Sequence, residues 1–448
     1  MMHFPISMAV PARFLAPLPA ACDVVVIGGG VVGVMTAWFL AERGMRVTLC
    51  EKGRIAGEQS SRNWGWIRQQ GRDAAELPIM VESLRLWQGL AQQFGDRLGF
   101  HQTGVMYLAG SEKAVEGYEA WLPHAQANGV DSRLMSRREV AARLKGAGPG
   151  WPGGLFTPSD ARAEPWVAVP ALVEGAIARG AVVIEDCAVR ALDLKAGRVA
   201  GVVTEKGRIA CDQVVLAGGA WSSLFTRAHG VDIPQLSVLA SVAATEPMPE
   251  IYPGGAAADD FAFRQREDGG LSLAPGAEHD FFLGPDALRH ATKYRKIFAK
   301  DRKSTHFRLA APKGYPDGWL TPRRWDADRT SPFEAIRVLN PAPNMATIAR
   351  TREAFAKAFP TLGRPKLRAV WAGMIDTMPD VVPVIDRAER VPGLTIATGM
   401  SGHGFGIGPG IGRVVADLVS GNAVGHDLSR FRLSRFTDGS EIILGPSL

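Results

Sequence analysis

Two short apolar runs, residues 24–27 and 47–50, flank a longer apolar segment over residues 31–42. Runs of about four to eight such residues bounded by turn residues predict buried strands. The segment between them is long enough for an amphipathic helix, and it follows a glycine-rich stretch directly. The pattern therefore predicts a strand, a turn, a helix and a second strand, which is the building unit of a parallel sheet.

The turn in this unit reads Gly28-x-Gly30-x-x-Gly33, and the second strand ends at Glu51. In a dinucleotide-binding turn the first glycine makes the tight bend, the second lets backbone approach the pyrophosphate, and the third lets the helix pack on the strand. The helix N-terminus offers free N–H groups to the phosphates. A carboxylate in the position of Glu51 forms a hydrogen bond with a ribose hydroxyl. The combination predicts a dinucleotide site; the alternative is a purely structural unit with a glycine-rich turn.

A second strand-and-glycine pattern lies towards the end of the chain. The apolar run 394–398 enters the turn Gly399-Met-Ser-Gly-His-Gly-Phe-Gly406, and a helix is predicted from there through residue 418. Between the two turns, residues 165–179 predict another amphipathic helix, and residues 182–217 predict strands joined by Lys-Ala-Gly and Glu-Lys-Gly turns. This series ends in Gly218-Gly219, and residues 261–273 predict a further hairpin.

With both turns considered, the sequence resembles the D-amino-acid oxidase-like (DAO) family of FAD-dependent amine and amino-acid oxidoreductases. It is most similar to the sarcosine oxidase and opine oxidase branch, whose flavin-facing turn also reads Ser-Gly-His-Gly-Phe. The resemblance covers most of residues 22–420. It implies FAD rather than NAD, and an α/β fold in which a Rossmann-like FAD-binding domain is interleaved with a mainly antiparallel-sheet (α+β) substrate domain.

The resemblance also implies domain bounds. We expect residues 22–100, 157–234 and 365–425 to form the FAD-binding domain, and residues 101–156 and 235–364 to form the substrate domain. We expect residues 1–21 to be a disordered leader rather than a signal peptide, because cleavage there would leave the first strand as the terminus.

The family pattern further implies which residues contact FAD. In the loop of residues 60–72, here called the flavin loop, no histidine or cysteine occupies a covalent attachment position of the family, so we expect FAD to be bound noncovalently. The implied contacts are Gly28, Gly30, Val32, Gly33, Glu51, Lys52, Ser60, Ser61, Arg62, Asn63, Gly65, Trp66, Val189, Gly218, Gly219, Trp221, Gly373, Gly399, Gly402, His403, Gly404, Phe405 and Gly406.

The flavin loop also carries the predicted catalytic chemistry. Its spacing Arg-Asn-x-x-x-Ile-Arg is similar to that of sarcosine oxidase-like proteins, in which the last arginine binds the substrate carboxylate; this implies that role for Arg68. A guanidinium fork suits a carboxylate, and a surface or interdomain ion pair is the alternative. Trp64 and Trp66 would wall a bulky or cyclic substrate, or simply pack. His403 is a candidate acid–base residue, with contact to the flavin ring as the favoured role.

Three positions depart from the family pattern. Ile375 stands where glycine oxidase-like members carry an arginine, and Asp376 follows it, as in the opine and multi-subunit sarcosine oxidase branch. Gly406 and Ser272 stand where monomeric sarcosine oxidases carry a carboxylate-binding and an oxygen-activating lysine. We therefore expect a substrate larger than glycine or sarcosine. The absence of the second lysine favours a dehydrogenase that passes electrons to a quinone or protein acceptor, with an oxidase that uses O₂ as the alternative.

The predicted chemistry is oxidation of a C–N bond in an amino acid or secondary amine. The substrate would be a D-amino acid, an N-substituted amino acid, a hydroxyproline or an opine; hydride transfer to flavin N5 would give an imine that hydrolyses. Two alternatives stay open. One is the catalytic flavoprotein subunit of a hetero-oligomeric opine or sarcosine oxidase, and the other is a flavoprotein without amine chemistry that serves in binding or RNA modification.

Charge and composition change this picture little. The chain has 448 residues, 46% of them hydrophobic, and a formal net charge of +6, too diffuse to predict a nucleic-acid partner. Residues 290–303 are the densest basic stretch, which we interpret as a solvated helix face, with partner docking as the alternative. Cys22, Cys50, Cys187 and Cys211 lack metal or CxxC spacing and predict buried free thiols. No apolar run predicts a membrane span. Free thiols are typical of a reducing compartment, so we expect a cytoplasmic protein, with peripheral contact to the inner face of a membrane as the alternative.

Overall fold

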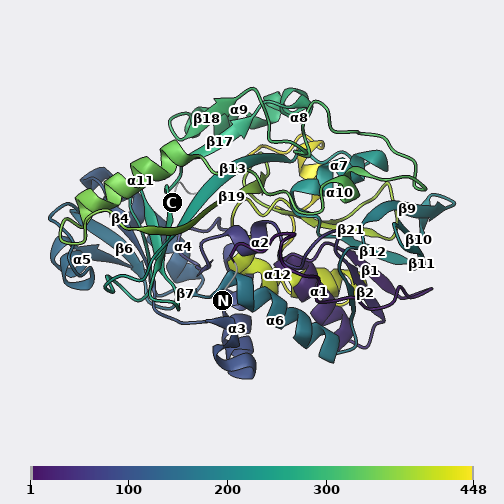
Figure 1. Ribbon diagram of the computed structural model, residues 1–448, viewed down its shortest axis with the longest axis horizontal. Helices are drawn as coiled ribbons and strands as arrows, with labels where there is room; N and C mark the ends of the chain where they lie inside the picture. Colours follow the sequence, from purple (N-terminus) through teal and green to yellow (C-terminus); the bar gives the residue numbers. More distant parts are fainter. Residues whose placement is uncertain (1–3, 446–448) are drawn as a thin grey trace.

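The computed structural model describes residues 4–445 and contains two large sheets (Figure 1). The first is a six-stranded sheet in which every strand is parallel to its neighbours except the edge strand β20. Its order is β20 (Val384–Arg387), β21 (Leu394–Thr398), β12 (Gln213–Leu216), β1 (Val24–Ile27), β2 (Val47–Cys50) and β8 (Val182–Ile184). This is the predicted Rossmann-like sheet, assembled from segments far apart in the sequence.

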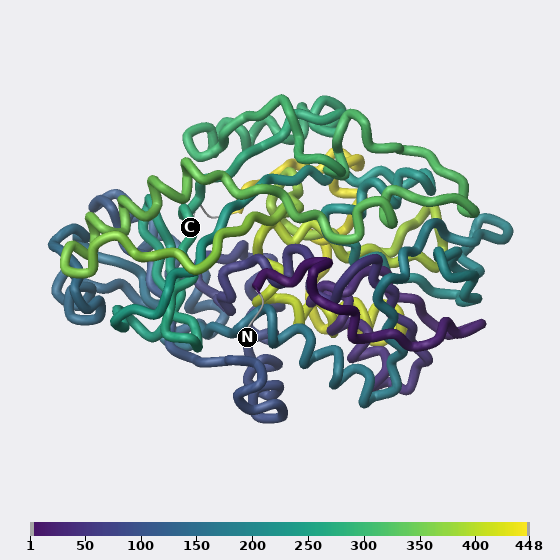
Figure 2. Tube along the Cα trace, viewed as in Figure 1, coloured from purple at the N-terminus to yellow at the C-terminus, as the bar shows by residue number. Residues whose placement is uncertain are grey.

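Helices cover this sheet in a layer around α1 (Val31–Glu42). The helix α1 packs against α12 (Gly404–Ser420) and α6 (Pro165–Ala178), and α12 also packs against α3 (Leu77–Phe94). The prediction of an amphipathic helix over residues 31–42 was wrong, because eleven of the twelve residues of α1 are buried between these neighbours and the sheet. Figure 2 shows the first, purple part of the chain beside the last, yellow part in this layer.

The second sheet has ten strands and is mainly antiparallel. The helix α11 (Met345–Ala358) packs on β13 and β16, and α4 (Glu112–Ala127) and α5 (Arg137–Arg143) pack at the other end. The strands are β18 (Thr305–Arg308), β17 (His279–Phe282), β13 (Leu236–Thr245), β16 (Leu271–Ala274), β15 (Ala262–Gln265), β14 (Gly255–Ala257), β4 (Val105–Ala109), β6 (Gly153–Thr157) and β5 (Arg133–Ser136), with β19 (Leu367–Thr377) paired to β13.

The strand β19 departs from the predicted domain bounds. Residues 365–425 were expected in the FAD-binding domain, but β19 pairs with β13 of the second sheet from Leu367 to Thr377. The long antiparallel ladder places residues 373–376 where the two sheets meet. The division of the chain into two domains is otherwise a prediction.

Smaller elements connect these sheets. The predicted strand series over residues 182–217 is present, and its middle part forms a separate three-stranded antiparallel sheet. The remaining elements are β9 (Val189–Lys195), β10 (Arg198–Thr204), β11 (Gly207–Ala210), the pair β3 (Trp66–Ile67) and β7 (Ala161–Arg162), the helices α2 (Gln59–Arg62), α7 (Ser222–Ala228), α8 (Pro285–Arg289), α9 (Ala291–Lys300) and α10 (Pro332–Ala335), and the 3₁₀ turns η1 (Gly95–Leu98), η2 (Gly219–Trp221) and η3 (Leu433–Phe436).

The first residues of the described chain are packed rather than free. The prediction of a disordered leader was wrong for residues 4–21: Ile6 and Phe14 are buried. The backbone N–H of Ile6 donates to Ser61 Oγ at 3.1 Å, and that of Phe14 donates to Glu185 Oε2 at 3.0 Å. These bonds tie the segment to the flavin loop and to the end of β8.

Three further expectations can be compared with the structure. All four cysteines are buried and free, as predicted. Within residues 4–445 no helix is both long enough and apolar enough to cross a membrane. The basic stretch over residues 290–303 includes α9, whose Tyr294 is buried while Arg295 and Lys296 are exposed. The exposed basic side agrees with the interpretation of a solvated helix face, and the inner side packs on the protein.

Candidate active site

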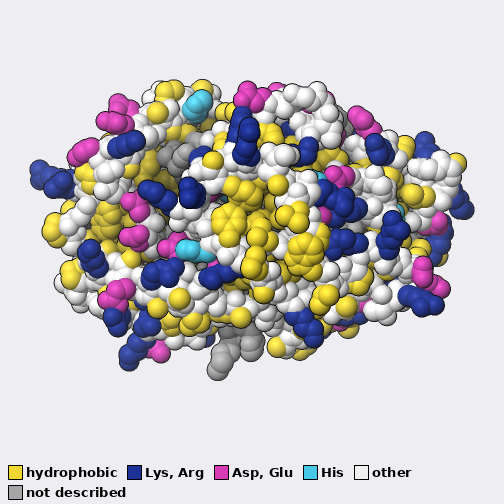
Figure 3. Space-filling view, turned by 90° about the horizontal axis from the view of Figure 1, so that it is seen from above, with side chains coloured by type: hydrophobic (Ala, Val, Ile, Leu, Met, Phe, Trp, Pro, Cys, Tyr) yellow, Lys and Arg dark blue, Asp and Glu magenta, His cyan; other side chains and the backbone are white. Residues whose placement is uncertain are grey.

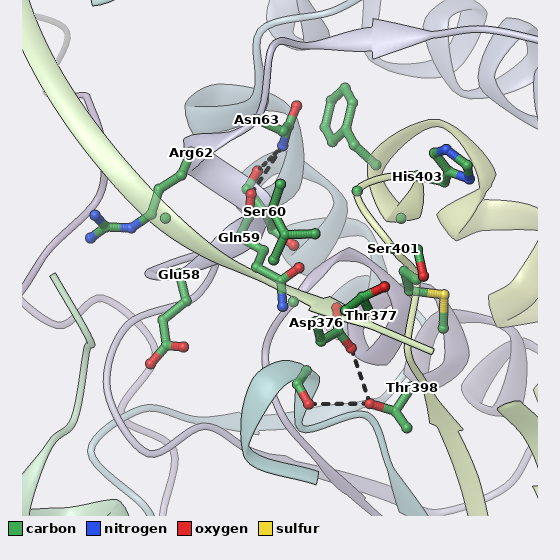
Figure 4. A pocket seen from close by; sticks show the side chains of 18 of the residues that line it. Glu58, Gln59, Ser60, Arg62, Asn63, Asp376, Thr377, Thr398, Ser401 and His403 are labelled. Atoms are coloured by element: carbon green, nitrogen blue, oxygen red, sulfur yellow. Dashed lines mark hydrogen bonds between the residues drawn. The ribbon is translucent and has the colours of Figure 1, made fainter. Parts of the chain in front are cut away.

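A cavity of about 570 Å³ runs between the two sheets and is lined from both. One end is formed by the two glycine-rich turns, the flavin loop and the Gly218-Gly219 segment. The other end is formed by β13, β17, α9 and the end of β19. The close-up in Figure 4 shows part of the first end, with α2 and the end of β19 facing one another. The arrangement is that of a cofactor site continuous with a substrate pocket.

The first glycine-rich turn can hold only glycine at two positions. Gly28 has φ +110°, and a Cβ there would lie 2.4 Å from the carbonyl oxygen of Ala217. A Cβ on Gly33 would lie 2.0 Å from the carbonyl oxygen of Gly28. The third glycine therefore lets α1 pack directly on the turn, as its place in the motif predicts.

Glu51 closes this turn from the end of β2. Its carboxylate accepts hydrogen bonds from the backbone N–H groups of Gly29 and Gly53, each at 2.7 Å. Burial raises the pKa of Glu51 to about 7, and these N–H groups and Lys52 oppose the rise. Lys52 itself donates to Glu58 at 2.7 Å, and Trp221 Nε1 donates to the same carboxylate at 3.0 Å. The side chains of Lys52, Glu58 and Trp221 form one wall of the cofactor end.

The flavin loop is held under the cavity by its own polar side chains. Ser60 Oγ accepts a hydrogen bond from the Val31 N–H at the start of α1, at 2.9 Å. Asn63 Oδ1 accepts from the Gly65 N–H at 2.7 Å, and Asn63 Nδ2 donates back to the Gln59 and Ser60 carbonyls. Figure 4 shows Asn63 turned towards α2 and the Arg62 guanidinium turned away from Gln59 and Ser60.

Asp376 joins the second glycine-rich turn to β19. Its Oδ2 accepts from the Gly399 N–H at 2.7 Å, from Gln235 Nε2 at 3.0 Å and from Thr398 Oγ1 at 3.2 Å. Burial raises the pKa of Asp376, although these donors favour its ionised form. Asp376 therefore shapes the turn, and both Asp376 and its neighbour Ile375 line the cavity.

Arg72 is the residue of the flavin loop whose charged side chain contacts the second glycine-rich turn. The buried Arg72 guanidinium donates from Nε to the Arg68 carbonyl at 3.1 Å and from Nη2 to the His403 carbonyl at 3.3 Å. Both Arg68 and Arg72 line the cavity. Arg68 also donates to the Gln70 carbonyl and lies over the Tyr107 ring, 5.6 Å from its centroid.

His403 has an acidic partner that the sequence did not predict. Its Nδ1 lies 3.2 Å from Oε2 of Glu76, which is fully buried. Burial, reinforced by the Arg72 charge, lowers the pKa of His403 to about 4, whereas the pKa of Glu76 is lowered by His403 and Arg72 against its own burial. A neutral ring beside an ionised carboxylate carries its proton on Nδ1, which leaves Nε2 as an acceptor.

The substrate end of the cavity is largely aromatic. Phe281 of β17 and Tyr294 and Phe298 of α9 line it, opposite Val238 of β13 and Ile375. Tyr294 is fixed because its hydroxyl donates to the Thr377 carbonyl at 2.6 Å. The predicted hairpin over residues 261–273 is present as β15 and β16, but none of its residues lines the cavity.

Most of the predicted site residues line the cavity. Those that do are Gly28, Gly30, Val32, Glu51, Lys52, Ser60, Arg62, Asn63, Trp66, Arg68, Val189, Gly218, Gly219, Trp221, Gly373, Gly402, His403, Gly404 and Phe405. Gly33, Ser61, Gly65, Gly399 and Gly406 lie behind it. A Cβ on Gly406 would be 3.2 Å from Ile67 Cα, so a side chain there would first meet the flavin loop.

Sequence reasoning missed Arg72, Glu76 and the aromatic wall from α9. The first two had a usable pattern, because Arg68, Arg72 and Glu76 recur at intervals of four residues. The aromatic wall had none, since the contacts of α9 with the cavity are made between segments distant in sequence. Ser272, aligned with the oxygen-activating lysine, is buried and accepts from Arg264 Nη2 at 3.3 Å.

Comparison with known proteins agrees with this geometry. Residues 23–418 match the DAO family of FAD dependent oxidoreductases. The chain belongs to this family. Sarcosine oxidase subunit beta of Rhizobium meliloti (strain 1021) is 26% identical over 426 residues, 93% of this chain and 89% of that protein. The structure of L-amino acid deaminase from Proteus myxofaciens in complex with anthranilate superposes with a TM-score of 0.90 at 30% identity, over 95% of this chain and 97% of that one. L-Proline dehydrogenase from P. horikoshii matches with a TM-score of 0.77 at 25% identity, over 94% and 100%.

As a DAO-family member, the protein is an FAD-dependent oxidoreductase, as the sequence predicted. The cavity fits this cofactor. A cradle without Cβ atoms at Gly28 and Gly30, the N-terminus of α1 and the carboxylate of Glu51 are the features that hold a dinucleotide. Arg72 Nη1 and Glu76 Oε1 are buried without a hydrogen-bond partner among the described residues, as expected beside a site that a polar ligand completes.

Proposed function

We propose that the protein oxidises the C–N bond of an amino acid or N-substituted amino acid that carries a bulky apolar group. The observation that carries this proposal is the meeting of Arg68 and Arg72 at a cavity whose far wall is aromatic. Arg68, Arg72 and an ionised Glu76 sum to one positive charge, which matches one carboxylate; burial raises the pKa of the neighbouring Asp160 to about 7, so below that pH Asp160 does not cancel this charge. The names of relatives, sarcosine oxidase subunit beta and L-amino acid deaminase, support the same substrate class.

The residues of the chain bind and orient the substrate. Bound FAD supplies the two-electron acceptor for the hydride that leaves the substrate carbon. The Arg68 fork holds the carboxylate, and this fixes the adjacent carbon. The wall of Phe281, Tyr294 and Phe298 excludes water, which lowers the pKa of the bound amine and favours the neutral form whose lone pair assists hydride loss. The resulting imine hydrolyses to a carbonyl compound and an amine or ammonia.

We further propose a quinone or protein as the electron acceptor. Lys52 is the one lysine that lines the cavity within the described residues, and it lies at the cofactor end, paired with Glu58. Ser272, at the position aligned with the oxygen-activating lysine, is turned towards Arg264. The substrate end therefore offers no lysine ammonium for activating O₂.

A second candidate function is catalysis as one subunit of a hetero-oligomer. It is favoured by the match to a protein named as a subunit, of which this chain covers 89%. Under this alternative the isolated chain would bind FAD but would not turn over.

An anaerobic absorbance titration tests these proposals. The purified holoprotein is mixed with D- and L-amino acids, N-methyl amino acids, hydroxyprolines and opines. Bleaching of the oxidised flavin by an amino acid with a bulky apolar group supports the main proposal, and slow return of colour in air supports an acceptor other than O₂. A yellow protein that no amine bleaches would contradict the main proposal. Acid precipitation of the same sample should release the colour, because FAD is expected to be noncovalent.

A further inference from the structure

Exposed apolar side chains gather on one face of the molecule. Five of the eleven large hydrophobic residues exposed within residues 4–445 fall between residues 288 and 320. We call them the apolar patch: Leu288 (63% exposed), Phe307 (51%), Leu309 (79%), Trp319 (59%) and Leu320 (97%). Figure 3 shows hydrophobic side chains at the centre of the face that carries α8, α9 and β18, with Lys and Arg side chains around them.

The segments that carry the apolar patch are joined at Leu283. The Leu283 N–H donates to the Arg308 carbonyl at 2.9 Å, and Trp319 Nε1 donates to the Leu283 carbonyl at 2.9 Å. The turn that carries Trp319 and Leu320 is also tied to α8, since Asp317 accepts from the Asp286 N–H at 2.8 Å. These bonds hold apolar side chains outward on an ordered framework.

The same stretch concentrates positive charge. Residues 288–325 contain eleven Lys and Arg against two Asp, a formal excess of nine, whereas the excess of the whole chain is six. The rest of the chain is therefore net negative. Lys296, Arg308 and Arg323 are paired with carboxylates. Five exposed cations of this stretch form neither an ion pair nor a side-chain hydrogen bond with any described residue: Arg295, Arg302, Lys303, Lys313 and Arg324.

We propose that the apolar patch and these five cations dock the protein on an anionic lipid surface. Protruding apolar side chains enter the boundary between headgroups and acyl chains, and Lys and Arg around them are attracted to anionic headgroups. A patch of apolar side chains surrounded by unpaired cations, with the rest of the chain net negative, matches the charge of an anionic lipid surface. The side chains of Leu320 and Leu309 are also the most exposed of the apolar patch, which suits insertion better than packing in a flat interface.

Docking by this face would place a bilayer beside the substrate pocket. The Phe307 ring lies 5.7 Å from the Phe281 ring and 5.6 Å from the Phe298 ring, and both of these line the cavity. Phe307 thus has one side on the apolar patch and the other on the wall of the pocket. This inference goes beyond the proposed function and does not depend on the identity of the substrate.

Co-sedimentation of the FAD-loaded protein with vesicles tests the proposal. We expect binding to vesicles of phosphatidylcholine mixed with phosphatidylglycerol, little binding to phosphatidylcholine alone, and weaker binding as salt is raised. The paired substitutions Leu309→Glu with Leu320→Glu, and Arg302→Glu with Lys303→Glu, should each lower the affinity about thirtyfold or more. Flavin absorbance and circular dichroism confirm that the variants are folded.

Arg137→Glu with Arg138→Glu is the matched control, because these adjacent exposed arginines on α5 form no ion pair within the described chain. The control should bind as the parent does. The proposal would be overturned if the control variant lost as much vesicle affinity as either of the other two double variants, or if the parent protein bound no vesicle. A concentration-dependent dimer that Leu309→Glu with Leu320→Glu breaks, without vesicle binding, would overturn it in favour of self-association.

Discussion

Arg68 and Arg72 lie four residues apart in the flavin loop and differ in how many hydrogen bonds each guanidinium already donates within the protein. Arg72 is buried and bonds two backbone carbonyls, whereas Arg68 bonds the carbonyl of Gln70 and is only part-buried. Arg68→Gln should therefore weaken substrate binding without loosening the loop. Loss of one charge-assisted contact is expected to lower kcat/KM roughly tenfold to hundredfold. Steady-state kinetics with the amine found by titration would measure this.

A matched pair of substrates isolates the role of Arg68. The Arg68→Gln variant should discriminate less between the amino acid and its methyl ester, which lacks the carboxylate charge, and Arg68→Lys should recover only part of the difference because it lacks the planar fork. An unchanged preference for the free acid would assign the carboxylate contact to another residue.

His403 gives the protein a pH dependence whose sign follows from burial. Its folded-state pKa of about 4 lies below the ordinary value near 6.5, so the unfolded chain binds the proton first. Stability is therefore lost as pH falls from about 6.5 towards 4, by up to about 3 kcal/mol. Urea unfolding at pH 7 and pH 5 should show a smaller loss in His403→Gln than in the parent. The exposed His124, changed to Gln, is the control; an identical loss in all three proteins would contradict the prediction.

At the scale of elements, the glycines of two helices should respond oppositely to alanine. A Cβ added to Gly33 in α1 would lie 2.0 Å from the Gly28 carbonyl oxygen. A Cβ added to Gly89 in α3 would lie in open space. Gly33→Ala should destabilise the fold by roughly 1–3 kcal/mol and weaken FAD binding, because the turn must move. Gly89→Ala should stabilise it by about 0.5–1 kcal/mol. Thermal unfolding and FAD titration would measure both, and a neutral Gly33→Ala would show that the turn is not close-packed.

The elements that the sequence predicted are those whose signal is local. The unit from β1 to β2 and the strand before Gly399 were predicted because a buried strand, a glycine turn and a helix follow one another directly. The pairing of β19 with β13 was not, since register between strands about 130 residues apart depends on tertiary contacts. The packed leader was missed for a related reason: Ile6 and Phe14 are isolated apolar residues without periodicity, and they are buried only because other segments cover them.

The candidate site shows the same division at the level of side chains. Arg68 and His403 were predicted because each lies in a short stretch with a family pattern, but the Glu76 partner of His403 lies 327 residues away in sequence. Contacts of that kind are created only when α3 and α12 pack together. The cofactor end could therefore be predicted from motifs, while the substrate end, built from β13, β17 and α9, could not.

At the scale of the whole molecule, the cofactor cavity draws on both sheets. The turn after β1, the segment after β12 and the turn after β21 belong to the first sheet, and β19 brings Gly373 and Ile375 from the second. A ligand bound across this junction stabilises both sheets together. We therefore expect a single cooperative unfolding transition. FAD should raise the free energy of unfolding of the whole protein by about 2.7 kcal/mol when free FAD is a hundred times its Kd.

Differential scanning calorimetry of the protein with increasing FAD measures this coupling. Gly373→Val places a branched side chain on β19 against Arg62. The Cβ and Cδ of Arg62 lie 3.1 and 3.2 Å from the place that a Cβ on residue 373 would take. The substitution should lower the FAD-dependent shift while leaving a single transition. Two transitions in the parent protein, of which FAD moves only one, would show that the sheets unfold separately and that the long β13–β19 ladder does not couple them.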